Sequence, residues 1–192
     1  MCSPCRAPTG GFDNDRSMSI AYRPGRAVLL AATAVLVACS PTFNWREVPI
    51  GDAGVIALLP CKPERATRDL PLGSASIPVD MAGCKAGGAT FAVAHARAES
   101  AEQAELWLRA WHAATRGQLA GAPVVESPAV LARAASSPAP ARLDTEGSDA
   151  AHVLWFAHRR PDGGASIYQA TVSGSPSSAE AVATFFEGFR IP

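Results

Sequence analysis

The chain has 192 residues, with 17 basic and 17 acidic side chains that give a formal net charge of zero. A chain without a basic excess lacks the electrostatic footprint of a nucleic-acid-binding protein, so we expect no nucleic-acid partner. Its length suits one domain with a hydrophobic core of its own.

The first informative segment is an apolar run near the amino terminus. Arg23 and Arg26 precede residues 27–38, in which Thr33 is the only polar side chain. About twelve apolar residues make roughly 18 Å of helix, well short of the ~30 Å hydrocarbon core of a bilayer. The run therefore predicts a cleavable secretory signal and not a spanning helix.

The run ends in "LVAC", residues 36–39, which resembles the lipobox of bacterial lipoproteins. The resemblance implies that the Cys39 thiol is joined to diacylglycerol, that the signal is cut before it, and that fatty acids such as palmitate anchor the chain. The expected location is then the cell envelope, with a membrane-bound, periplasm-facing domain. Ser40 after the cysteine slightly favours the outer membrane over the inner one. The alternative is an ordinary signal that happens to contain a cysteine.

This interpretation divides the chain. Residues 1–38 are a signal with a dispensable extension, in which translation starts at Met1 or at Met18, and the Cys2/Cys5 pair is discarded with it. Residues 39–44 form a lipidated tether, and residues 45–192 form one domain. Loss of residues 1–38 removes four arginines and two aspartates, which leaves a net charge of −2.

Cys61 and Cys84 remain in the exported part of the chain besides Cys39. An even pair in an oxidising compartment predicts a disulfide bond. The alternative is a metal site shared with a histidine, but neither cysteine has a ligand at metal-binding spacing. We expect no metal and no cofactor.

Five extended segments are expected in the first half of the domain. "NWREVPI" and "VIALLP" predict short strands, and residues 61–84 predict two extended pieces around a turn at Gly73. Pro71 and Pro78 favour an edge position for these pieces. "GGATFAVAHARA" predicts a strand with four alanines on one face, against which a helix can lie closely. Its other face carries Phe91, Val93, His95 and Arg97.

A helix is expected to begin after Ser100, where "SAEQ" matches a capping box. Gly121 and Pro123 are expected to end it. Its apolar side carries Ala104, Trp107, Leu108, Trp111 and Leu119. The two tryptophans at this spacing are interpreted as core residues.

The remainder alternates between loops and strands. "VVES" and "AVLAR" are each a candidate short strand, and an Ala/Pro-rich loop is expected near residues 132–142. "HVLWFAHRR" and "ASIYQATVSG" predict a hairpin covered on both faces. "SSAE", residues 177–180, is expected to begin a short helix with inward-facing phenylalanines.

This order predicts an α+β domain with an antiparallel-rich sheet, a long helix after the third or fourth strand, and a short C-terminal helix. The order, together with "ALLPCKPE", "FAVAHA", "ASIYQATVSG" and "FFEGFRI", resembles the PsbP-like α/β/α sandwich and small lipoproteins that share it. That family lacks a shared catalytic constellation and implies binding or stabilisation of larger complexes. No functional residue carries over.

No catalytic motif is visible along the chain. His112 is expected to be solvated, and His152 and His158 lie about 20 Å apart at the ends of one strand. His95 is interpreted as a hydrogen-bonded core histidine. Asp144, with Glu146 and Asp149, is expected in a solvated loop.

The sequence thus favours a non-enzymatic accessory module that docks an envelope protein assembly, with Trp45 as a weak candidate for its contact surface. Two alternatives stay open. One is a carrier of a small lipophilic ligand, held between the sheet and the Trp107/Trp111 helix. The other is a hydrolase, which requires polar groups that converge near His95.

Overall fold

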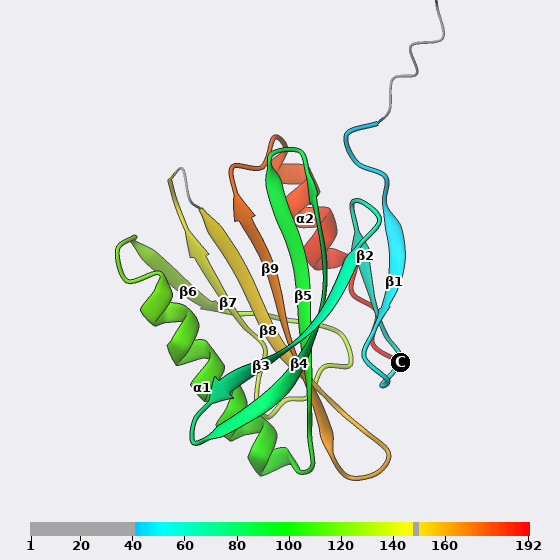
Figure 1. Cartoon of the computed structure of the whole chain (residues 1–192), viewed down its shortest axis with the longest axis vertical. Coiled ribbons are helices and arrows are strands. Elements are labelled where there is room, and N and C mark those ends of the chain that lie inside the picture. Colours follow the sequence, from blue (N-terminus) through cyan, green and yellow to red (C-terminus); the bar gives the residue numbers. More distant parts are fainter. Residues whose placement is uncertain (1–40, 148–149) are drawn as a thin grey trace, which may run out of the picture. The chain divides into compact units, whose positions relative to one another are not determined.

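A seven-stranded sheet in which every neighbouring pair is antiparallel forms the centre of the domain. The computed structural model describes residues 41–147 and 150–192. Within these ranges the strand order is β3-β4-β5-β9-β8-β7-β6 (Figure 1). The strands are β3 (Glu64–Leu72), β4 (Ala75–Ala86), β5 (Ala89–Ala98), β6 (Val124–Pro128), β7 (Ala141–Thr145), β8 (Ala151–Arg159) and β9 (Ala165–Gly174).

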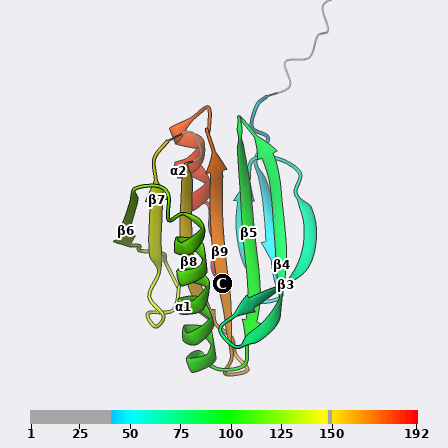
Figure 2. The same ribbon diagram turned by 60° about the vertical axis from the view of Figure 1, so that its left-hand side comes forward.

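One face of the sheet is covered by helix α1 (Ala101–Gln118). Figure 2 shows this helix in front of β8 and β9. The small side chains of Ala94, Ala96 and Ala98 on β5 let α1 approach, and they pack in one core with Leu108 and Trp111 of the helix. The alanine face of this strand thus meets the helix, as the sequence predicts.

The cap of α1 is also formed as predicted. The Ser100 side chain accepts a hydrogen bond from the backbone N–H of Gln103 at 3.2 Å. The Gln103 side chain accepts in turn from the backbone N–H of Glu99 at 2.7 Å. Two donors at the start of the helix are therefore satisfied by side chains.

The opposite face carries a separate hairpin and the second helix. Strands β1 (Arg46–Ile50) and β2 (Val55–Leu59) pair with each other in a two-stranded sheet, and Ile56 of β2 also forms a backbone bridge with Arg190 near the end of the chain. Helix α2 (Ala179–Glu187) lies beside them, and Val55, Leu59 and Phe185 are fully buried in the core of this face. The sheet is thus enclosed between α1 and a layer formed by the hairpin and α2.

The α+β class and the antiparallel sheet agree with the prediction, but three details differ. The long helix follows the fifth strand along the chain, which is the third strand of the seven-stranded sheet, because the separate β1–β2 hairpin comes before that sheet. Pro71 lies in the edge strand β3, as predicted, but Pro78 lies in β4, which is not an edge strand, although its stretch of β4 pairs only with β3. The "AVLAR" segment forms no strand, whereas "VVES" lies in β6.

No helix among the described residues is long and apolar enough to cross a membrane. The predicted signal and the candidate lipidation site at Cys39 lie outside the described residues.

Candidate functional site

Three polar side chains are buried together on the face of the sheet that carries the β1–β2 hairpin. His95 of β5 lies opposite Tyr168 of β9, and Arg97 lies opposite Ser166 two residues along. Alternate residues of a strand share a face, so these four side chains project to the same side. His95 is 4% exposed, and Ser166 and Tyr168 are completely buried. We call His95, Ser166 and Tyr168 the buried polar cluster.

His95 lacks a hydrogen bond within the part of the chain that the structure describes, because neither of its ring nitrogens has a partner there. The hydroxyl groups of Ser166 and Tyr168 interact with each other, and this contact lowers the pKa of Tyr168 against the effect of burial, although it lies outside normal hydrogen-bond geometry. An unpaired buried donor or acceptor costs about 1–3 kcal/mol, and folded proteins leave few of them. His95 was expected to be a hydrogen-bonded core histidine. It is a core residue, but the expected hydrogen bond is absent from the described chain.

The imidazole of His95 lies beneath the turn between β1 and β2. Gly51 in this turn has a φ of +66°, and a Cβ atom there would lie 2.5–2.7 Å from three ring atoms. The ring of Tyr168 is a further neighbour, at a centroid distance of 5.0 Å. Any residue other than glycine at position 51 would therefore displace the turn or the ring.

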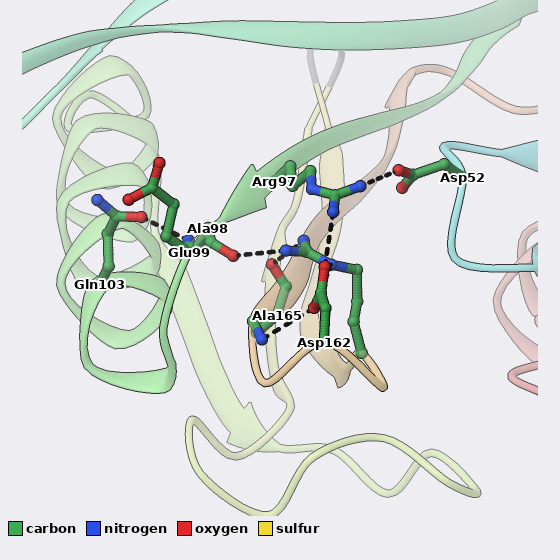
Figure 3. Close-up of polar contacts among 9 residues, drawn as sticks. Asp52, Arg97, Ala98, Glu99, Gln103, Asp162 and Ala165 are labelled. Carbon is green, nitrogen blue, oxygen red and sulfur yellow. Dashed lines mark hydrogen bonds and ion pairs between the residues drawn. The ribbon is translucent and has the colours of Figure 1, made fainter.

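A chain of ion pairs holds the turn against the sheet, as Figure 3 shows. Arg97 bridges Asp52 of the turn and Asp162 of the β8–β9 loop, with 2.6 Å between Arg97 and Asp162. Arg160 contacts Asp162 and donates to the backbone carbonyl oxygens of Ala98 and Ala165. The turn is thus linked through Arg97 to the β8–β9 loop, at the start of β9.

A cavity of about 600 Å³ opens beside His95. Its walls combine charged and polar side chains with apolar ones: Asp52, Arg65, Thr67, Asp80, Met81 and Arg97 are among them. The Thr67 hydroxyl donates to Asp80 at 2.6 Å. A volume of this size falls within the range of small-molecule sites.

The position of the cavity follows from the pairing of β4 with β5. The ladder between these strands ends at the pair Asp80 and His95, so residues 75–79 and 96–98 do not continue it. The two strands separate at this point. His95 lies at the fork, and it also lines a second space of about 160 Å³ that reaches Trp107 of α1.

Burial keeps the cluster uncharged near neutral pH. Desolvation lowers the pKa of His95, and the nearby carboxylates of Asp52 and Asp80 only partly oppose this effect. Burial also raises the pKa of Tyr168 to about 12. His95 therefore offers one N–H donor and one nitrogen acceptor, and Tyr168 and Ser166 offer hydroxyl groups.

The contacts of His95 bear on whether it could act as a general base. A general base acts on a nucleophile within hydrogen-bond reach and is held by a third group. Among the described residues, His95 has no hydrogen bond to a carboxylate or to a hydroxyl. The site can form hydrogen bonds with a ligand. Among the described residues, however, His95 has no hydrogen-bonded partner to which it could pass a proton.

The other histidines do not join this site. His152 Nδ1 lies 2.7 Å from Asp144, which also accepts a bidentate contact from Arg142. Burial raises the pKa of Asp144, but the hydrogen bonds from Arg142 and His152 outweigh it and lower the pKa overall. Asp144 was expected in a solvated loop. It lies instead in β7, where its strand partners position it.

His112 differs from the prediction as well. It was expected to be solvated, but its ring packs edge-on against Trp155 at 4.5 Å between centroids. Its Nε2 atom is buried and lies 3.6 Å from Glu126, which is too long for a hydrogen bond. His158 lies at the far end of β8 from His152.

The space between the sheet and α1 is largely filled by side chains. Trp111 is buried in the core, and Trp107 packs against that core. The described cavities along α1 measure about 120 Å³ and 160 Å³. Both volumes fall short of the ~300 Å³ at which ordinary ligand sites begin.

Trp45, the candidate contact residue, is half-buried and not a free surface aromatic. Its ring stacks on Phe43 at 6.0 Å and meets Phe91 edge-on at 6.4 Å. It directly precedes β1 and packs against the core on this face of the sheet.

Cys61 and Cys84 lie at disulfide-bonding distance, with Cα atoms 5.9 Å apart. The pair closes the open end of the β3–β4 hairpin, just beyond the ladder pair Glu64 and Gly83. Within residues 41–147 and 150–192, no group of three or more His, Cys, Asp or Glu side chains could hold a metal ion.

Sequence patterns identified His95 but missed its partners. The sequence patterns placed Ser166 and Tyr168 in a strand. Their alternation with Ile167 could have indicated that these two side chains share one face of the sheet. Asp52, in a turn more than forty positions away, had no local pattern to connect it with Arg97.

Comparison with known protein families and with curated proteins found no match to this chain.

Proposed function

We propose that this chain is a lipid-anchored protein of the cell envelope, whose domain faces the periplasm and acts by binding. The observation that carries the proposal is the "LVAC" box at residues 36–39 after a short apolar run. Fatty acids on Cys39 would hold the domain at a membrane, since several acyl chains anchor far more firmly than one. Ser40 slightly favours the outer membrane.

The Cys61–Cys84 pair supports an exported location. Two cysteines at bonding distance suit an oxidising compartment, whereas cytosolic proteins rarely keep such bonds. The first described residue, Pro41, follows Cys39 closely, so a lipidated cysteine would leave only a short tether before β1.

We also propose that the fold is of the PsbP-like sandwich type. Its support is the enclosure of one antiparallel sheet between α1 and the layer of α2 and β1–β2. A role in docking an envelope assembly rests on this proposal, and the partner would be a membrane or envelope protein.

The two alternatives now stand differently. A lipophilic carrier would need more room than the described cavities between the sheet and α1 provide. A hydrolase would have polar groups near His95, and such groups are present at the cavity. The lack of a hydrogen-bonded base among the described residues favours ligand binding over hydrolysis.

The test of the proposal is the intact mass of the native protein from a detergent-extracted membrane fraction. A chain that begins at Cys39 and carries acyl groups would support the anchor, and a gain of about two mass units on reduction would support the disulfide. The matched control is Cys39→Ser, which should appear without acyl groups. A soluble product that still carries residues 1–38 would refute the envelope assignment.

The docking role needs a separate experiment. Chemical cross-linking in intact cells, followed by purification of the anchored protein, should capture one defined envelope protein. The Cys39→Ser variant should lose that product if the anchor brings the partners together. Capture of no specific protein by the anchored form would contradict an accessory role.

A further inference from the structure

The cavity beside His95 has the properties of a small-molecule site that is separate from the lipid anchor. We propose that it binds a small uncharged molecule rich in hydroxyl groups, such as a monosaccharide or a polyol, beneath the β1–β2 turn. The inference goes beyond the proposed function, because the cavity is lined by β1, the β1–β2 turn, β3, β4 and β5 and needs no acyl chain.

The first argument is the unpaired imidazole. His95 is 4% exposed, lines the cavity, and has no partner for either nitrogen among the described residues. A neutral imidazole offers a donor on one nitrogen and an acceptor on the other. A hydroxyl group can both donate and accept, so it matches either nitrogen.

The second argument is the balance of charge. The cavity wall holds two carboxylates, Asp52 and Asp80, and two guanidinium groups, Arg65 and Arg97. Arg97 is already paired with Asp52 and with Asp162. The wall therefore has no formal excess of either sign, which favours an uncharged ligand over an ion.

The third argument is the mixture of donors and acceptors. Asp80 only accepts hydrogen bonds, and Arg65 only donates them. Thr67, which already donates to Asp80, adds a hydroxyl oxygen that can accept. Met81 and Ile50 supply apolar wall between these groups. A sugar ring presents the same alternation of hydroxyl groups and C–H surface.

The β1–β2 turn would act as the cover of the site. Gly51 lies on the imidazole, so a ligand reaches the ring nitrogens only when the turn shifts. The turn is fastened by the ion pair between Asp52 and Arg97, whose side chains are 55% and 52% exposed. Exposed ion pairs are weak, so this fastening can open.

The test uses the full chain in detergent, labelled with ¹⁵N-histidine and observed by NMR. The probes are D-glucose, N-acetylglucosamine and D-mannitol, with acetate and ethylammonium as charged comparisons. His95 signals are assigned with His95→Gln, and His158→Gln serves as the matched control. At least one uncharged probe should shift the His95 signals to saturation, while His158 stays unchanged.

Two variants make the test specific. Asp80→Asn and Thr67→Val change the wall with little change of size, and each should weaken the affinity for that probe at least tenfold. The Cys39→Ser chain should bind as well as the native one, so the anchor and this site fail independently. The proposal is overturned if no uncharged probe shifts His95, if only a charged probe does, or if both wall variants bind unchanged.

Discussion

Loss of the Cys61–Cys84 bond should destabilise the domain through its unfolded state. The bond joins residues separated by 23 positions along the chain. A cross-link that closes a loop of this length lowers the entropy of the unfolded chain, which corresponds to about 3.4 kcal/mol of stability near room temperature. For a domain of this size the melting temperature should fall by about 7–14 °C.

The double variant Cys61→Ala/Cys84→Ala removes both sulfur atoms and leaves no unpaired thiol at this site. Parent and variant would both carry Cys39→Ser, and their unfolding in urea would be followed by tryptophan fluorescence. The variant should unfold at lower urea concentration and with a steeper dependence on urea, because its unfolded state exposes more surface.

Reduction provides the control for this prediction. A reducing agent should lower the stability of the parent to nearly that of the variant and should leave the variant unchanged. A loss below about 1 kcal/mol, or equal loss in parent and variant on reduction, would refute the loop-closure argument.

Three further predictions concern the core, the helix cap and the buried cluster. Phe185→Ala should cost about 3–5 kcal/mol in urea unfolding, because the ring is completely buried. Ser100→Ala should cost about 1 kcal/mol by the same assay, since it removes the cap of α1. The pKa of His95 is lowered by burial. The unfolded chain therefore binds more protons than the folded one below about pH 6.5, and stability should fall as the pH drops from there. His95→Gln should flatten that part of the stability curve measured by urea unfolding, and an unchanged slope would contradict the assignment.

Local patterns predicted most elements because their causes are local. The alternation along β5 and the cap at Ser100 depend on residues within a few positions of each other, so their outcome could be anticipated. The edge position predicted for Pro71 is confirmed, because β3 is an edge strand, whereas Pro78 lies in an inner strand, at a stretch of β4 that β5 does not reach. Which case applies to Pro78 depends on how far β5 extends beside β4. That extent is a property of the pairing and not of either segment alone.

The candidate site was predictable only in part for the same reason. His95 was singled out as a core histidine, but its environment comes from three distant segments. The turn at Gly51, the strand with Tyr168 and the loop with Asp162 meet there only after the sheet has formed. The prediction for Asp144 was wrong for a related reason. The short acidic stretch around it resembled a loop, but Asp144 lies in β7 and pairs with β8.

The position of the Cys61–Cys84 bond also determines how the domain would respond to force. A pull on the chain ahead of Pro41 enters at β1, which pairs with β2, and the hairpin is held to the rest of the domain by the bridge between Ile56 and Arg190. Tension would therefore act on this hairpin, and on the turn over His95, before it reaches the seven-stranded sheet. The next point to bear load is Cys61, where the covalent bond carries the force directly to Cys84 in β4. Residues 62–83 are bypassed, so β3 keeps its place at the edge of the sheet while the hairpin is extended.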